Sequence, residues 1–416
     1  MKKLMSLFCV SLICLLCGCN DAMKVRETVT YTVNKPVYMS ADVFRSSVKV
    51  TTQPEEITQK GKICFYEGYL YVSEPGKGIH IIDNRNLVGF IELMGNADLA
   101  IRNNLLYADS YVDLVWFDIS NPALPALKNR LENVFLQSFP PIEEGIIDSE
   151  VFSEAGRAKG VVVGWTQEEV TETYEYYKDE IYYNDMGAIS ESSSGGGSTG
   201  VNGSMSRFGL YKDYLYVVLN NQMDIFDLSG AEPVVAAETI PVGWNVETIF
   251  SYKDCMFMGT PTGMLIYSVK DPLKPEYQSS LTHVYGCDPV VVEDDIAYVT
   301  VHSGNNCGQN FNELIIINVS DVKRPQPIVS YTMTKPKGLG IDNGTLFLCD
   351  DGLKIYNADD PQTLMANRLA HYSGMEGYDV IPYNNVLMMI AEDGIYQYDY
   401  SDLKEIRLLS KIAVKK

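Results

Sequence analysis

Four acidic residues occur at matching places along the chain and could act together on a cation. Each stands nine or ten residues before an aromatic residue or a methionine in a short apolar segment; they are Asp98, Glu247, Asp288 and Asp379. Ca²⁺ prefers a set of carboxylate and carbonyl oxygens. These acids therefore predict either a Ca²⁺ site or carboxylates that cap backbone amides. Lys62, Arg207 and Gly338 fill the matching places elsewhere, so the acidic set is interrupted.

Few other residues are spaced for catalysis. The four histidines, at positions 80, 283, 302 and 371, form no H-x-H or H-x-x-x-H pair, and beyond residue 19 there is no C-x-x-C pair. The Gly-rich run at 195–197 lacks the flanking lysine that a phosphate-binding loop requires. Paired carboxylates alone can support hydrolysis. We therefore weigh two hypotheses, a non-catalytic binding protein and a metal-assisted hydrolase or lyase that uses the acids.

The charge of the chain limits its partners. Lys and Arg number 33 against 54 Asp and Glu, which gives a net charge of −21. A protein that binds nucleic acid needs a basic surface to neutralise phosphates. We therefore exclude nucleic acid and expect a protein or a glycan as partner.

The elements that must position these residues recur seven times. Their shared pattern is apolar–x–apolar–apolar or aromatic–Asp, Asn or Ser. The segments are IHIID at 79–83, LVWFD at 114–118, MDIFD at 223–227, MLIYS at 264–268, LIIIN at 314–318, LKIYN at 353–357 and IYQYD at 395–399. Each follows a second apolar segment and a polar turn such as Glu67-Gly68 or Asn103-Asn104. Such pairs tolerate left-handed backbone and make tight hairpins.

A four-stranded unit of roughly 40 residues repeated in series is typical of a β-propeller. We predict an all-β, seven-bladed β-propeller of four-stranded antiparallel blades, with strands a to d in each blade and a short N-terminal extension. An eighth, degenerate blade within the 109-residue interval between Leu114 and Met223 is one alternative. A β-solenoid is another, but its repeats are shorter.

The repeat resembles a known family. The run GKGIHIID at residues 76–83, the run ADSYVDL at 108–114 and the stretch PVYMS at 36–40 are similar to the LVIVD repeat of bacterial surface proteins. The resemblance covers nearly all of the chain that follows the N-terminal segment. It implies a propeller lipoprotein of the outer membrane or cell surface. It implies no catalytic residues.

The N-terminal residues predict export and lipidation. Lys2 and Lys3 precede an apolar run at 4–16, and the quartet Leu16-Cys17-Gly18-Cys19 resembles a bacterial lipobox, L-x-G-C. We expect a signal peptide at 1–18, a lipid on the Cys19 thiol and attachment to the membrane of the cell envelope. Residues 19–60 would then form a linker with a short capped helix after Ser40. A strand at 28–33 could close the ring by pairing with the last sheet. The propeller would span 61–416.

An insertion between the second and third units, at about 138–206, contains a predicted strand at 160–165 and a group of tyrosines. The tyrosines are Tyr174, Tyr176, Tyr177, Tyr182 and Tyr183. They predict either a hairpin packed on the propeller wall or an aromatic platform for a sugar or a partner, because tyrosine is favoured at interfaces.

Two cysteines could be linked. After the signal segment and Cys19, five cysteines remain, of which Cys64, Cys255 and Cys349 have apolar neighbours and suggest buried thiols. Cys287 precedes the first strand of the fifth unit, and Cys307 lies in the long b–c loop of the same unit. In an exported protein we expect a disulfide between Cys287 and Cys307, with two free thiols as the alternative.

Strand order predicts which face of the propeller is functional. If strand a starts on the top face, every d–a connection and every b–c loop lies there. The insertion is a d–a connection and the loop at 302–313 is a b–c loop, so both belong to the top face, with the four acids. Function concentrates in such loops. We therefore expect a non-catalytic binding or scaffold propeller whose top face engages its ligand.

Overall fold

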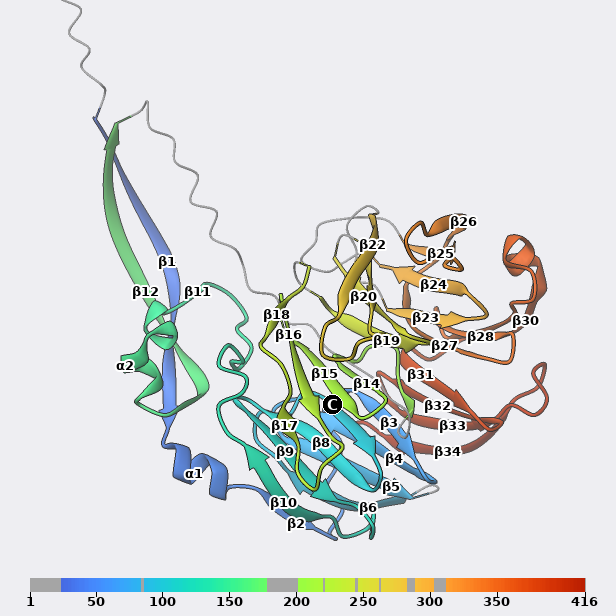
Figure 1. Cartoon of the computed structure of the whole chain (residues 1–416), viewed down its shortest axis with the longest axis horizontal. Helices are drawn as coiled ribbons and strands as arrows, with labels where there is room; N and C mark the ends of the chain where they lie inside the picture. The colour runs from blue at the N-terminus through green and yellow to red at the C-terminus, as the bar shows by residue number, and fades with distance from the viewer. Residues whose placement is uncertain are drawn as a thin grey trace, which may run out of the picture.

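The computed structural model describes residues 24–83, 86–177, 201–219, 221–243, 246–261, 263–282, 289–302 and 312–415. Within these ranges the chain forms eight sheets, seven of which have four or more strands. Figure 1 shows these seven sheets side by side around a centre, with the eighth sheet projecting from them. The predicted all-β propeller is confirmed.

The seven sheets are here called blades 1 to 7. Blade 1 contains β3 (Ile63–Tyr66), β4 (Tyr69–Glu74), β5 (Gly78–Asp83) and β6 (Asn86–Glu92). Blade 2 contains β7 (Leu99–Arg102), β8 (Leu105–Ser110), β9 (Asp113–Asp118) and β10 (Ala126–Leu131). Blade 3 contains β14 (Phe208–Tyr211), β15 (Tyr214–Leu219), β16 (Gln222–Asp227), β17 (Val234–Val235) and β18 (Ile240–Pro241).

Blade 4 contains β19 (Thr248–Tyr252), β20 (Cys255–Thr260), β21 (Gly263–Ser268) and β22 (Glu276–Thr282). Blade 5 contains β23 (Val290–Glu293), β24 (Ile296–Val301), β25 (Glu313–Asn318) and β26 (Gln326–Thr332). Blade 6 contains β27 (Pro336–Asp342), β28 (Thr345–Asp350), β29 (Leu353–Asn357) and β30 (Arg368–Tyr372), with the 3₁₀ helix η2 (Pro361–Asn367) between its last two strands. Blade 7 contains β31 (Gly377–Tyr383), β32 (Val386–Ala391), β33 (Gly394–Asp399) and β34 (Arg407–Ala413).

The turns between strands a and b have the backbone that the sequence predicts. In every blade at least one turn residue has a positive φ. These residues are Glu67 and Gly68, Asn103 and Asn104, Lys212, Lys253, Asp294 and Asp295, Asn343 and Gly344, and Asn384 and Asn385. A positive φ in a two-residue turn matches the twist of the strands that it joins.

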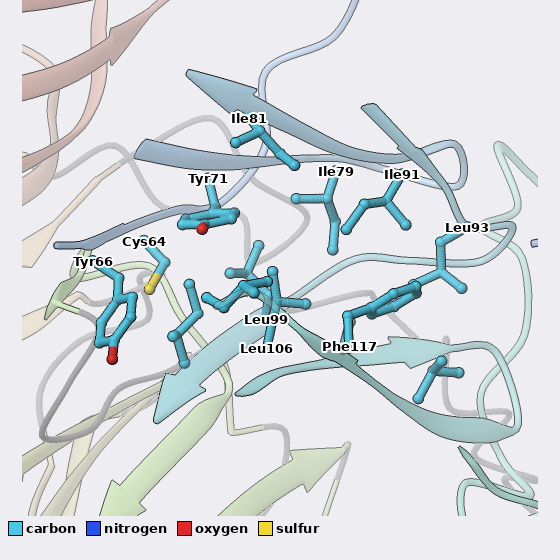
Figure 2. Close-up of a cluster of buried hydrophobic side chains, with 14 residues drawn as sticks. Cys64, Tyr66, Tyr71, Ile79, Ile81, Ile91, Leu93, Leu99, Leu106 and Phe117 are labelled. Carbon is cyan, nitrogen blue, oxygen red and sulfur yellow. The ribbon is translucent and has the colours of Figure 1, made fainter. Parts of the chain in front are cut away.

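Apolar side chains fill the spaces between neighbouring blades. Figure 2 shows one such cluster, in which Tyr71 and Ile81 of blade 1 pack with Leu99, Leu106 and Phe117 of blade 2. All five are fully buried. Each blade therefore covers the faces of its neighbours, and this explains apolar runs in place of one-sided alternation.

The ring closes between blade 7 and blade 1. Ile63 and Val72 of blade 1 share a buried cluster with Met388 and Ile390 of blade 7. Ile57 belongs to the same cluster; it forms a parallel bridge with Val414, and the Lys415 amide donates to the Ile57 carbonyl at 2.8 Å. The N-terminal segment thus helps to close the ring, because Ile57 pairs with the residues that follow the last strand of blade 7.

The predicted strand at 28–33 exists but has another partner. It is part of β1 (Lys24–Met39), which pairs with β12 (Val161–Tyr177) and β11 (Ile146–Ile147) in the eighth sheet. Its expected pairing with the last sheet is therefore wrong. The physical reason is that β12 offers β1 a continuous partner, from Lys24↔Tyr177 to Met39↔Val161.

A short helix leads from this sheet to the propeller. The helix α1 (Ala41–Ser46) follows Ser40 as predicted, but the Ser40 side chain makes no capping hydrogen bond. After α1, β2 (Lys49–Thr51) adds to the outer edge of blade 1. The insertion also contains a 3₁₀ helix, η1 (Ser149–Phe152), and a one-turn helix, α2 (Glu154–Arg157).

Candidate functional site

Two of the predicted acids hold the segment by which the insertion returns to the propeller. Asp98 of blade 2 is fully buried. It accepts hydrogen bonds from the Arg207 amide at 2.7 Å and from the Ser206 hydroxyl at 3.1 Å. Burial raises the pKa of Asp98 to about 7, although the positive charges of Arg207 and Lys62 oppose this rise.

Asp379 of blade 7, on the other side of blade 1, binds the same segment. Its carboxylate accepts from the Ser204 amide at 3.1 Å, the Ser204 hydroxyl at 2.9 Å and the Met205 amide at 3.3 Å. Burial raises the pKa of Asp379 to about 6, while the hydrogen bonds from Ser204 favour the charged form. A Cβ at Gly203 would lie 1.9 Å from Asp379 Oδ2, so the return segment approaches this closely only with glycine.

The return segment also pairs with the innermost strands. β13 (Val201–Asn202) adds to β3 on the inner side of blade 1. The Leu339 amide of blade 6 donates to the Ser204 hydroxyl at 2.9 Å, and the Ile249 amide of blade 4 donates to the Ser206 carbonyl at 3.0 Å. Residues 201–207 therefore connect blades 1, 2, 4, 6 and 7 across the centre of the ring.

The other two acids of the predicted cation site are Glu247 and Asp288. Glu247 lies just before β19 of blade 4 and is 8% exposed, whereas Asp288 falls outside the described residues. In the part of the chain that the structure describes, no three His, Cys, Asp or Glu side chains are grouped so as to hold a metal ion. Asp98 and Asp379 are engaged with serines and backbone amides, which is the second of the two arrangements that their spacing predicts.

The structure also explains why Gly338 and Lys62 stand where other blades have an acid. Gly338 of blade 6 has no side chain because Asp379 occupies that space; a Cβ there would lie 2.3 Å from Asp379 Oδ1. The Lys62 ammonium lies 5.6 Å from the centre of the Tyr378 ring and is close enough to Asp98 and Asp379 to favour their charged forms. The basic residues thus compensate buried carboxylates.

A second set of acids went unnoticed in the sequence. Glu74, Asp109 and Asp350 stand at or next to the end of strand b in blades 1, 2 and 6. Each accepts two backbone amides from the segment that enters strand a of its own blade: Thr58 and Gln59, Ala97 and Asp98, Thr334 and Lys335. An acid two or three residues after the aromatic residue of strand b would have been the signal.

His80 contacts one of these acids, Glu74, and has a structural role. It is fully buried in β5, its Nε2 lies 2.7 Å from Glu74 Oε2, and its ring centre lies 4.7 Å from that of Phe90. The Glu74 pKa lies at about 2, because hydrogen bonds from His80, Lys77 and Thr58 outweigh the effect of burial.

The eighth sheet is fixed to the top face by a buried ion pair. Asp113, at the start of strand c in blade 2, is fully buried. It accepts from Arg45 Nε of α1 at 2.9 Å, Arg45 Nη2 at 3.1 Å, Arg130 Nη1 at 3.1 Å and the Asn133 amide at 2.9 Å. Around this pair, Phe44, Tyr111 and Val161 form a small apolar cluster. These contacts attach α1, at the base of the eighth sheet, beside the b–c turn of blade 2.

A cavity of about 170 Å³ lies at this junction. Its wall includes Tyr38 of β1, Arg45 of α1, Phe139 and Arg157 of the insertion and Val112 of blade 2. The Tyr38 hydroxyl is buried with no hydrogen-bond partner in the described part of the chain. Elements of both the insertion and the propeller line the cavity.

Beyond its base, the eighth sheet is a ribbon in which residues 24–35 of β1 pair with 166–177 of β12, and it is two-stranded from Thr32 and Glu169 outward. Figure 1 shows it extending away from the blades. Residues 26–30 of β1 and 166–169 and 171–174 of β12 are exposed. On one face, Thr28 pairs with Thr173 at 3.1 Å and Thr30 with Thr171 at 2.9 Å between their hydroxyl oxygens. Neither face of the ribbon is covered along these residues.

The predicted tyrosine group belongs in part to this ribbon. Tyr174 is 48% exposed, and its hydroxyl donates to the Glu172 carboxylate. Tyr176 and Tyr177 are the last two residues of β12. Tyr182 and Tyr183 lie outside the described residues. The tyrosines of β12 thus belong to a ribbon that projects from the propeller. The sequence had left open a hairpin packed on the propeller wall or an aromatic platform for a sugar or a partner.

The predicted disulfide cannot be placed, because Cys287 and Cys307 both lie outside the described residues. Cys64 and Cys349 are buried free thiols, and burial raises the pKa of each well above its usual value. Cys255 is partly buried, and burial likewise raises its pKa. These three thiols are therefore poor nucleophiles at neutral pH.

No helix among the described residues has both the length and the apolar composition needed to cross a membrane. The predicted lipid site, Cys19, lies outside the described residues, five positions before the start of β1. Lipidation and attachment to the envelope therefore stay predictions.

Comparison with known proteins agrees with the repeat. The LVIVD repeat family matches residues 95–132 and 202–231. The first range is blade 2, and the second contains the return segment and the first three strands of blade 3. No curated protein sequence matches the chain.

Solved structures share the architecture at very low sequence identity. A protein from Lactobacillus plantarum is 10% identical, with 86% of this chain and 97% of that chain covered and a TM-score of 0.50. BamB from Moraxella catarrhalis is 8% identical, with 88% and 92% covered and a TM-score of 0.45. Hsv2 from Kluyveromyces lactis is 9% identical, with 84% and 97% covered and a TM-score of 0.44. The likeness to the protein from Lactobacillus plantarum speaks for the fold alone. The chain therefore carries LVIVD repeats at residues 95–132 and 202–231 and folds as a β-propeller.

Proposed function

We propose that this protein is a non-catalytic binding or scaffold propeller of the cell envelope, held to the membrane by a lipid on Cys19, whose top face engages a partner protein. The observation that carries the proposal is the contrast at that face. Two of the four predicted acids, Asp98 and Asp379, are occupied by the return segment, whereas the ribbon that leaves the same face has both of its faces exposed.

Topology supports the assignment to one face. The insertion leaves after β10, the outermost strand of blade 2, and returns before β14, the innermost strand of blade 3. Such a d–a connection begins and ends on the top face. The Arg45–Asp113 ion pair fixes the base of the ribbon at the b–c turn of blade 2, which is on the same face. An exposed ribbon that is attached at its base by an ion pair is suited to recognition.

Two measurements test this proposal. Mass spectrometry of the protein from its own envelope should find acyl chains on an N-terminal Cys19, and the Cys19→Ala variant should leave the membrane fraction. The lipidated protein, purified from detergent-solubilised envelope through a C-terminal tag, should retain one envelope protein in stoichiometric amount. A tag-only control and the envelope of a deletion strain set the background.

Other outcomes would contradict the proposal. A Cys19→Ala variant that stays with the membrane would rule out the lipid anchor. Retention of a polysaccharide that survives protease treatment, with no protein, would rule out a protein partner in favour of a glycan. Turnover of a small molecule by the purified protein, lost on chelation of metal ions, would rule out the non-catalytic role.

A further inference from the structure

The ribbon has a long free edge. In the eighth sheet β12 pairs with β1 on one side, and within the described ranges no strand pairs with its other side. This edge runs the whole length of β12, and the single register shift of the pair, between Val37 and Tyr38, lies near the base. Figure 1 shows the edge free of the propeller over most of its length.

A free edge of this length is unusual in a protein that stays apart from others. Natural edge strands are usually short, bulged, or protected by lysine or proline. An isolated two-stranded ribbon is also marginally stable in water, and a third strand would stabilise it. The row of unpaired amides and carbonyls on β12 is a template for β-strand addition.

The charges of β12 indicate which strand fits. Glu168, Glu169 and Glu172 are exposed on the ribbon. If a second copy paired with β12 in antiparallel fashion about Val170, Glu168 would stand opposite Glu172 and like charges directly opposite are destabilising. The net charge of −21 opposes self-association further. The acids therefore disfavour a second copy and favour a basic strand.

The alternation of side chains sets the spacing. Glu168, Val170, Glu172 and Tyr174 share one face of β12, and Glu169, Thr171 and Thr173 share the other. A complementary strand would carry Lys or Arg at two positions four residues apart, with an apolar residue midway between them opposite Val170. Aromatic contact with Tyr174 would extend the match at one end.

We propose that the free edge of β12, between Thr166 and Tyr174, accepts an extended strand of a partner protein that carries two basic residues four positions apart. This inference rests on the proposed binding function and names its surface and the chemistry of the partner. Main-chain hydrogen bonds would supply the affinity, and the pairs with Glu168 and Glu172 would supply the register.

The test uses the full mature chain and one synthetic probe. The probe is a nine-residue peptide with Val at positions one, five and nine, Lys at positions three and seven, and Thr at the other positions. At saturating peptide, hydrogen exchange of amides in residues 166–174 should slow at least tenfold, and amides of the propeller should not change. Reversal of both charges, Glu168→Lys with Glu172→Lys, should weaken peptide binding at least tenfold.

Two controls separate strand addition from simple charge attraction. The matched variant Glu238→Lys with Glu276→Lys makes the same charge change at exposed positions of blades 3 and 4 and should bind the peptide within twofold of the wild type. A peptide with N-methyl groups at alternate residues keeps its charge but cannot form the ladder, and it should not bind. Equal thermal midpoints of the two variants show that both are folded.

Several results would overturn the inference. Among them are equal binding of the N-methylated peptide, equal loss in both charge variants, or a wild-type dimer in sedimentation that protects residues 166–174. If Cys19 is acylated and an envelope protein is retained but the peptide does not bind, only the edge is wrong. If the peptide binds but nothing is retained from the envelope, the proposed function fails.

Discussion

The blades and the ribbon are built from the same kinds of residue and use them in opposite ways. In β8 of blade 2, Leu106 and Tyr107 are at most 2% exposed, whereas Tyr174 of β12 is 48% exposed. Tight turns and neighbouring blades determine the side chains of the propeller. The ribbon has no such neighbours, so core packing does not account for its sequence. This difference leads us to look for function on the ribbon.

The largest difference in stability between the propeller and the ribbon should come from a substitution in the propeller core. Phe117 is fully buried between blades 1 and 2. Phe117→Ala should lower the free energy of unfolding by about 4 kcal/mol, because the lost burial and the remaining cavity both destabilise the protein. The matched change in the ribbon, Tyr174→Ala, should stay within about 0.5 kcal/mol. Urea titration followed by fluorescence measures both.

If Phe117→Ala and Tyr174→Ala lower the free energy of unfolding equally, the ribbon is packed against another surface in solution. The contrast between a packed propeller and an exposed ribbon would then be wrong. A loss below about 1 kcal/mol for Phe117→Ala would mean that blades 1 and 2 repack easily, in conflict with a close-packed interface.

The second comparison concerns the joint between the two regions. Arg45→Ala removes two hydrogen bonds to the buried Asp113, while Arg130 and the Asn133 amide still contact this carboxylate. We expect a loss of about 2 kcal/mol, typical of hydrogen bonds to a charged group. The control Arg324→Ala breaks an ion pair with Asp321 whose Arg324 side chain is 82% exposed, and it should cost at most about 0.5 kcal/mol.

Limited proteolysis adds a readout specific to the joint. Cleavage around α1 should be faster in Arg45→Ala than in Arg324→Ala. If both variants are cleaved at the wild-type rate, the ion pair does not fix the ribbon to the top face.

Local rules of the repeat explain how much of the fold the sequence predicts. The polar pairs before each strand b, such as Asn384-Asn385, mark turns because few residues accept positive φ, and the structure has positive φ at each of them. The apolar segments between them become strands because both faces are buried. These features depend on residues within one unit.

Contacts between distant segments were not predictable in the same way. The spacing of Asp98 and Asp379 indicates that they matter, but their partners Ser206 and Ser204 lie 108 and 175 residues away in sequence. The alternation at 28–33 predicts a strand, yet any free sheet edge could pair with it. Only the three-dimensional arrangement selects β12. The pairing of Cys287 with Cys307 stays a prediction.

The third comparison is between the channel mouth and the ribbon in their response to pH. The pKa of Asp379 is about 6 in the folded protein, above the value of about 3.9 for an unfolded chain. The folded state therefore binds this proton more tightly, and the stabilisation is complete below pH 4 and is lost as the pH rises through 6. Asp98, at about 7, acts in the same direction.

Asp379→Asn removes this titration. Its thermal midpoint relative to the wild type should therefore improve as the pH rises from 4 to 7, starting from a cost of about 1 kcal/mol for altered hydrogen bonds. The exposed ribbon acid in Glu169→Gln should show no such trend. A difference between Asp379→Asn and wild type that does not depend on pH would mean that Asp379 is ionised throughout, held by Lys62 and the amides of the return segment.

The smallest effect tests the ribbon itself. The hydroxyls of Thr30 and Thr171 lie 2.9 Å apart on an exposed face, and such a cross-strand pair contributes about 0.5 kcal/mol. Thr30→Ala should therefore speed the hydrogen exchange of ribbon amides about twofold, with exchange in the blades unchanged. Thr171→Ala and the double variant complete a mutant cycle. If the double variant costs no more than either single one, the two threonines act as a pair. If the losses simply add, the ladder is only a geometric coincidence. If the blades also exchange faster, the ribbon is coupled to the propeller core, and the contrast between a packed propeller and a free ribbon does not hold.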